Sequence, residues 1–295
     1  MNISKTFRAN GILFLAAIIW GCAFGFQRQV ADEIHSITVL GIRFAIALIC
    51  LLPFFLLSNK NNPSDTPVPS NFKIKCAIFF SGITQFSACA FQQWGIESTT
   101  AGNAGFITGI YVVIIPLLGL LWGQQPGKGA WYGVILATLG LYLLSVKGSF
   151  EVNHGDFKIL ICAFICAIHG HLIGWLSPKC RALKLAFQQY LICAIFGLGY
   201  AIYAKNIPDL SILLQYKIAF LYLGVFSTAC GFTLQIIGQK IVSPTHAAII
   251  LSLETVFAAL TGYLMLGEIL STRALIGCGL MLAGMFVAQL WKKSQ

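Results

Sequence analysis

Charged residues are scarce in this sequence. Only 9% of its 295 residues are Asp, Glu, Lys or Arg, whereas 58% are hydrophobic and the mean hydropathy is +0.83. A soluble domain has about 25% charged residues, and a chain this apolar does not stay dissolved in water. The composition therefore excludes an ordinary soluble protein and predicts one that is embedded in lipid.

Motifs for catalysis, nucleotide hydrolysis and metal binding are also missing from the sequence. It contains no G-x-x-x-x-G-K-[ST] loop, which argues against an ATP-driven pump. It contains no H-E-x-x-H and no charged catalytic cluster, which argues against a membrane enzyme. Its ten cysteines form no C-x-x-C pair, and all but Cys180 lie in apolar runs, where free cysteine behaves as a small hydrophobe. We therefore expect no metal site and no cofactor.

Long apolar runs fill most of the chain. A membrane-spanning helix needs about twenty apolar residues, and strands are excluded because these runs do not alternate in polarity. The ten predicted spans are 10–30, 36–58, 74–95, 100–122, 129–147, 156–176, 184–204, 217–239, 245–266 and 272–291. The sequence thus predicts an all-α membrane protein with ten transmembrane helices.

Positive charge is concentrated on one side of the predicted membrane. With the N-terminus inside, inside segments carry 12 of the 19 basic residues, outside segments carry six, and Arg43 lies within a span. The inside residues are Lys5, Arg8, Lys60, Lys73, Lys75, Lys128, Lys179, Arg181, Lys184, Lys240, Lys292 and Lys293. The positive-inside rule then places both termini in the cytoplasm of a multi-pass inner-membrane protein. Orientation explains the net charge of +10, so no nucleic-acid partner is expected.

The two halves of the chain resemble each other. The stretch "NAGFITGIYVVIIPLLGLLWGQQ" aligns with "HAAIILSLETVFAALTGYLMLGE", and neighbouring spans align in the same order. The aligned pairs are Gly119 with Gly262, Gly133 with Gly277, Gly140 with Gly284, Gly82 with Gly224, and Gln93 with Gln235. This pattern predicts two five-helix repeats, 1–150 and 151–295. Because five is odd, the second repeat is inverted, an arrangement of secondary transporters whose substrate site lies at the midplane.

Several stretches also resemble a known family. They are "WGCAFGFQR", "IRFAIAL", "TAGNAGFITGIYVVIIPLLG", "GDFKILICAFICAIHGHLIG", "GVFSTACGFTLQIIGQK", "HAAIILSLETVFAALTGYLMLGE" and "GLMLAGMFVAQLW". Together they are similar to the EamA-type branch of the drug/metabolite transporter superfamily, over about 10–291. The resemblance implies ten helices, two inverted repeats (5+5) and a central cavity. It leaves the substrate open, because relatives resemble exporters or exchangers of amino acids, metabolites, nucleotide sugars and toxic compounds.

Glu254 lies near the middle of an apolar span. A carboxylate there costs roughly 3 kcal/mol on insertion scales, so it should face the protein interior or water. Such a Glu can carry a proton across the membrane or bind the amine of a substrate; the alternative is a protonated, purely structural Glu. Tyr111 aligns with Glu254, which predicts that the two lie on opposite walls of one cavity. A core tyrosine with a locally bonded hydroxyl is the alternative.

Other polar or aromatic residues are candidates for the cavity wall. Gln93 and Gln235 would line it, or else hold helices together. His169 and His171 point to different helix faces and cannot chelate one metal well, and His169 facing the cavity is a candidate proton carrier. Trp20 is expected to form apolar wall.

Arg43 and Pro116 are candidates for gating. Arg43 lies about 10 Å deep in its span, where we expect it to snorkel to the outer headgroups, with a role in an outer gate as the alternative. Pro116 removes a backbone hydrogen bond, which gives either a flexible kink or tolerated curvature.

The sequence therefore favours a secondary carrier that exports or exchanges a small polar metabolite, such as an amino acid, with proton coupling through Glu254 as a further hypothesis. Its expected partners are the substrate, protons and the lipid bilayer. A toxic-compound efflux carrier is an alternative within the same class. A channel and an integral membrane enzyme are alternatives from other classes.

Overall fold

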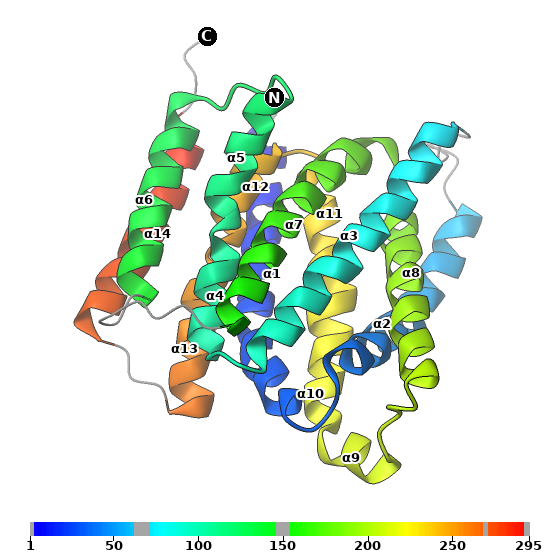
Figure 1. Ribbon diagram of the computed structural model, residues 1–295. Coiled ribbons are helices and arrows are strands. Elements are labelled where there is room, and N and C mark those ends of the chain that lie inside the picture. Colours follow the sequence, from blue (N-terminus) through cyan, green and yellow to red (C-terminus); the bar gives the residue numbers. More distant parts are fainter. Residues whose placement is uncertain (1–2, 62–70, 146–153, 268–270, 292–295) are drawn as a thin grey trace.

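A computed structural model describes residues 3–61, 71–145, 154–267 and 271–291, and every secondary-structure element in these ranges is helical (Figure 1). The first elements are α1 (Ile3–Ala31), α2 (Ser36–Asn61), α3 (Phe72–Ile96), α4 (Ala101–Gly109), α5 (Tyr111–Leu121) and α6 (Lys128–Ser145). The later ones are α7 (His154–Leu176), the 3₁₀ turn η1 (Ser177–Lys179), α8 (Ala182–Tyr203), α9 (Leu210–Gln215), α10 (Lys217–Leu221), the π-helix η2 (Tyr222–Phe232), α11 (Thr233–Gln239), α12 (Pro244–Leu251), α13 (Glu254–Leu266) and α14 (Thr272–Leu290).

The predicted spans coincide with these helices. In the described ranges, nine helical runs are long and apolar enough to cross a membrane, and Lys128–Leu144 is a shorter apolar helix. That helix corresponds to the predicted span 129–147, of which 146 and 147 lie outside the described residues. The predicted boundary between 150 and 151 also lies outside them.

The bundle is apolar on its outer surface and carries polar groups within. Leu121, Leu264 and Leu290 are 80%, 70% and 78% exposed, whereas Gln93 and Thr228 are fully buried. Water would penalise such an outer surface, but lipid tails are as apolar as leucine. The distribution of side chains is therefore that of a protein surrounded by lipid.

Glycines allow the helices to pack closely. A Cβ atom added to Gly140 of α6 would lie 2.5 Å from the carbonyl oxygen of Gly277 in α14, and one added to Gly277 would lie 2.5 Å from that of Gly140. Related contacts occur in matched pairs at a nearly constant displacement along the chain. The matched contacts are Gly82–Ile192 with Gly224–Ile46, Gly95–Ile159 with Gly238–Leu13, and Gly133–Gly284 with Gly140–Gly277.

Two spanning helices are interrupted near their midpoints. Between α4 and α5, the backbone N–H of Ile110 bonds to the carbonyl of Ile107 at 3.2 Å. Between α12 and α13, the N–H of Leu253 bonds to the carbonyl of Ile250 at 3.2 Å. Both are tight, 3₁₀-type hydrogen bonds, which often mark a hinge or a functional site inside a longer helix. A third irregularity, the π-helix η2, lies in the yellow helix of Figure 1.

Candidate functional site

A cavity lies in the middle of the bundle, where the irregular segments meet. It has an empty volume of about 770 Å³, including its opening. Its wall is built by α1, α2, α3, α4, α5, α7, η2, α11, α12 and α13. Gln27 and Gln92 line one end of the cavity. Gln239 and Pro244 line the other end, at the turn between α11 and α12.

Most of the residues that the sequence analysis placed on the cavity wall line this cavity. They are Trp20, Tyr111, His169, Gln235 and Glu254. Gln93 is fully buried but is not among the lining residues; its Nε2 donates a hydrogen bond of 3.2 Å to the backbone carbonyl of Gln27. Pro116 is buried in α5 and is likewise not among them.

Tyr111 and Glu254 enter the cavity at the two helix interruptions, as the first residues of α5 and α13. Both are almost completely buried. Their hydroxyl and carboxyl groups are close enough to interact electrostatically. Apart from this mutual interaction, Tyr111 Oη and Glu254 Oε1 have no hydrogen-bond partner among the described residues. A buried polar atom without a partner is costly, so this pair is suited to bind water, a proton or a substrate group.

The cavity is also rich in amides. The lining glutamines are Gln27, Gln85, Gln92, Gln235 and Gln239. The buried Oε1 atoms of Gln27, Gln85, Gln235 and Gln239 have no hydrogen-bond partner among the described residues, and Gln85 lacks one for Nε2 as well. Leaving such a group unpaired costs about 1–3 kcal/mol, so the wall is suited to water or a polar ligand.

Sequence analysis missed Gln85. The signal was available, because Gln85, Cys89 and Gln92 follow a spacing of four and three residues that places them on one face of α3. All three line the cavity. The same face of α3 therefore carries a polar stripe inside an otherwise apolar span.

Arg43 does not reach the headgroups, so the expected snorkelling was wrong. Its side chain is 3% exposed and lines the cavity. Nε donates to Thr228 Oγ1 at 2.9 Å, and Nη2 donates to Ser227 Oγ at 3.1 Å. The depth of a residue in a span does not reveal the direction of its side chain, and this one points inward because α2 packs against η2.

The π-helical backbone of η2 holds these two hydroxyl groups in place. Thr228 Oγ1 donates to the carbonyl of Leu223, five residues earlier, at 2.7 Å. Tyr190 Oη donates to the carbonyl of Thr228 at 3.0 Å, and Trp20 Nε1 donates to that of Ser227 at 3.0 Å. Trp20 therefore both lines the cavity and positions η2. Such π-helical segments occur frequently at functional sites.

The two histidines of α7 point to different places, as their spacing requires. His169 lines the cavity, and its Nε2 is hydrogen-bonded to Gln189 Oε1 at 3.0 Å. His171 Nε2 donates to the carbonyl of Ile115 at 2.8 Å. Within the described ranges, no group of three or more His, Cys, Asp or Glu is arranged to hold a metal ion.

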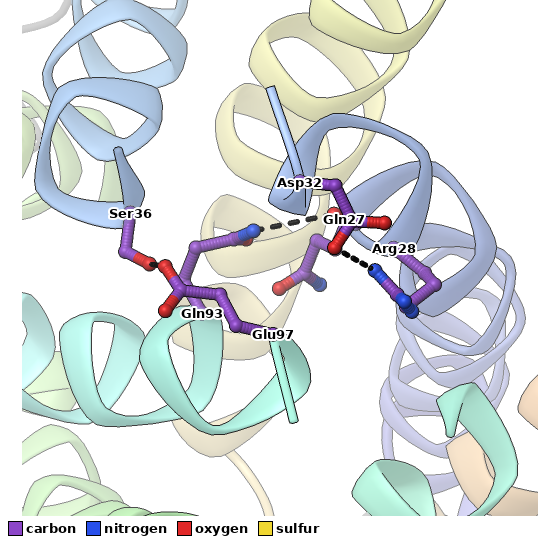
Figure 2. Close-up of polar contacts among 6 residues, drawn as sticks. All are labelled: Gln27, Arg28, Asp32, Ser36, Gln93 and Glu97. Carbon is purple, nitrogen blue, oxygen red and sulfur yellow. Dashed lines mark hydrogen bonds and ion pairs between the residues drawn. The ribbon is translucent and has the colours of Figure 1, made fainter. Parts of the chain in front are cut away.

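Contacts among α1, α2 and α3 close the bundle near the α1–α2 turn (Figure 2). Ser36 Oγ donates a hydrogen bond to Glu97 Oε1, and Gln93 reaches Gln27 as described above. Arg28 forms an ion pair with Asp32 at 2.8 Å on the exposed side. The Ser36–Glu97 contact connects the start of α2 with the end of α3, and the Gln93–Gln27 contact connects α3 with α1 at the end of the cavity.

A family model for EamA-like transporters matches this chain twice, over residues 8–146 and again over residues 153–289. The chain belongs to the EamA-like transporter family. This membership, together with its apolar spanning helices, identifies it as a multi-pass membrane transporter.

Proteins named as transporters match almost the whole chain. An uncharacterized transporter of Archaeoglobus fulgidus is 31% identical over 279 residues, covering 94% of this chain and 84% of that protein. The uncharacterized inner membrane transporter YedA of Escherichia coli K12 is 22% identical over 287 residues, with 96% and 90% covered. A protein of known crystal structure aligns with a TM-score of 0.75 at 17% identity, covering 96% of both chains, which shows similarity of fold.

Proposed function

We propose that this EamA-like protein is a secondary active transporter of the cell membrane, which exports or exchanges a small polar metabolite, such as an amino acid, by alternating access. The observation that carries the proposal is the central cavity. Buried amide, hydroxyl and carboxyl atoms line it that have unused hydrogen-bonding capacity within the described part of the chain, inside a bundle whose outer surface is apolar. A polar solute would satisfy those groups in the middle of the membrane.

The proposed architecture is ten helices in two inverted five-helix repeats, residues 1–150 and 151–295. The matched glycine contacts support it, since inverted repeats would pair each contact in one half with an equivalent contact in the other. The two separate family matches support it as well. In Figure 1, α1 runs downward and α7 runs upward, as inversion requires.

The structure is compatible with one state of an alternating cycle. The cavity lining reaches Pro244 at the α11–α12 turn, while the Ser36–Glu97 and Gln93–Gln27 hydrogen bonds close the opposite end (Figure 2). α1 begins and α14 ends on the side of the α11–α12 turn (Figure 1). The positive-inside rule assigns that side to the cytoplasm, so we infer an inward-facing state.

Solute counterflow tests the carrier. Purified protein is screened for thermal stabilisation by metabolite pools, and each hit is then measured as uptake into proteoliposomes loaded with the unlabelled solute. A carrier gives saturable uptake that rises with internal solute. Flux that neither saturates nor responds to internal solute would indicate a channel and contradict the proposal.

Proton coupling through Glu254 is a separate part of the proposal. We expect Glu254→Gln to keep solute exchange but to lose the dependence of net transport on a pH gradient, because the amide cannot exchange a proton. The measurement is uptake with and without an imposed gradient. Full dependence on the gradient in the variant would show that Glu254 is not the coupling group.

A further inference from the structure

Arg43 is a buried cation without a counter-ion. It is 3% exposed, and among the described residues it has no ion pair with a carboxylate. Its hydrogen-bond partners, Ser227 and Thr228, are neutral hydroxyl groups. A cation removed from water is costly unless it is paired, so its position on the wall of a cavity indicates that the missing anion comes from a ligand.

The guanidinium group still has donors for such an anion. It carries five N–H groups, and the two observed bonds use the single N–H of Nε and one of the two on Nη2. The second N–H of Nη2 and both on Nη1 remain. The end of the guanidinium therefore offers two parallel N–H groups, which is the arrangement that binds both oxygens of a carboxylate.

Gln85 provides an independent indication of a ligand. It lines the same cavity, is 1% exposed, and neither of its amide atoms has a hydrogen-bond partner among the described residues. Its helix α3 packs against α2, which carries Arg43. Because Gln85 and Arg43 line the same cavity, the unpartnered Nε2 group of Gln85 offers a second donor to an anion that enters it.

We propose, on the basis of the carrier function above, that Arg43 and Gln85 form a subsite that binds the carboxylate group of the transported solute. Arg43 supplies the charge and the two-pronged geometry, and Gln85 supplies a further donor. Ser227 and Thr228, fixed by the π-helix η2, hold the guanidinium in position and leave its end free.

The subsite is distinct from the Glu254 region. Arg43 lies on α2 and Glu254 on α13, and these two helices are not a closely packed pair in the described residues. The rings of Trp20 and Phe232, whose centroids are 4.8 Å apart, provide apolar wall. The preferred solute therefore has a carboxylate at one end and an apolar or aromatic body.

The test compares two ligands that differ only in this group. Equilibrium dialysis of nanodisc-embedded protein measures binding of radiolabelled 3-phenylpropionate and of its neutral amide, 3-phenylpropionamide, in constant chloride. Thermal stabilisation by acetate and acetamide repeats the comparison without the ring. We expect the wild type to bind each acid at least tenfold more tightly than its amide.

Variants then test whether Arg43 and Gln85 cause the preference for the acid over its amide. Arg43→Gln should reduce it to less than twofold, and Arg43→Lys should retain a part of it. Arg28→Gln removes the same charge from the exposed ion pair with Asp32 and should leave the preference unchanged. If Arg43→Gln does not fold, Gln85→Met provides the test of the subsite. This variant should weaken acid binding severalfold without lowering thermal stability, because it removes only unpartnered polar atoms.

Three results would overturn the subsite. The wild type could bind acid and amide equally, or bind no acid at all. Alternatively, Arg43→Gln or Gln85→Met could keep the full preference for the acid. The carrier function would still stand if counterflow is measured with another solute. Absence of counterflow with every metabolite would instead remove the carrier function itself.

Discussion

At the scale of single residues, two buried tyrosines near the cavity differ in the partners of their hydroxyl groups. Tyr190 is fully buried beside the cavity, and its hydroxyl bonds to the carbonyl of Thr228 and to Thr233 Oγ1, both at 3.0 Å. Tyr111 is nearly as buried, but its hydroxyl interacts with the carboxyl group of Glu254 in the cavity and has no other hydrogen-bond partner among the described residues. One hydroxyl therefore contributes to stability, whereas the other is available to a ligand.

This contrast predicts opposite effects of one substitution at two sites. Tyr111→Phe should leave the free energy of unfolding unchanged within about 1 kcal/mol, because the hydroxyl interacts only with the Glu254 carboxyl group in the cavity, and should slow solute exchange severalfold. Tyr190→Phe should cost about 1–3 kcal/mol, because it leaves the buried Thr228 carbonyl without this donor. Thermal unfolding and counterflow measure both effects. Equal destabilisation by the two variants would assign Tyr111 a structural role.

The sequence predicted some site residues and not others for a physical reason. Glu254 was identifiable because a carboxylate in the middle of an apolar span must avoid lipid. The direction of Arg43 was not, because its long side chain reaches either headgroups or interior from the same depth. Gln93 and Gln235 align in the repeat, yet only Gln235 lines the cavity, while Gln93 bonds to the backbone of α1. Neighbouring helices decide such cases, and a single sequence does not contain them.

At the scale of helices, the positions of the spans were predictable and their irregularities were not. Bilayer thickness fixes the length of an apolar run, and the predicted span 217–239 covers the same residues as α10, η2 and α11. The π-helical turns within it, and the tight turn at Ile110, depend on contacts with other helices. These irregular segments are the ones that carry Ser227, Thr228 and Tyr111.

The seam between α6 and α14 provides a test at this scale. Gly277→Ala should destabilise the protein by about 1–3 kcal/mol, because the added Cβ would lie 2.5 Å from the backbone oxygen of Gly140. Gly279, two residues further along α14, has no atom within 4 Å of such a Cβ. Gly279→Ala should therefore be neutral, or stabilise the helix by up to about 1 kcal/mol. Thermal unfolding in detergent compares them, and destabilisation by both would contradict the close contact.

At the scale of the whole molecule, the repeated helix contacts and the central cavity belong together. Glycine contacts recur at a nearly constant displacement along the chain, and residues from both family-matched segments line the cavity. In inverted-repeat transporters, each half adopts in turn the arrangement of the other, which moves the opening across the membrane. The contact between Ser36 and Glu97 closes one end here, so transport requires that this contact open and re-form.

Cross-linking this contact is the most direct test of alternating access. Ser36→Cys and Glu97→Cys are introduced together into a cysteine-free protein, joined by a short reducible cross-linker, and assayed by counterflow. A matched control joins Tyr132→Cys to Trp291→Cys, whose native rings lie 5.1 Å apart at the α6–α14 seam. The account predicts that the first cross-link abolishes exchange, that reduction restores it, and that the control cross-link leaves exchange intact. Full exchange with Ser36→Cys and Glu97→Cys still joined would contradict it.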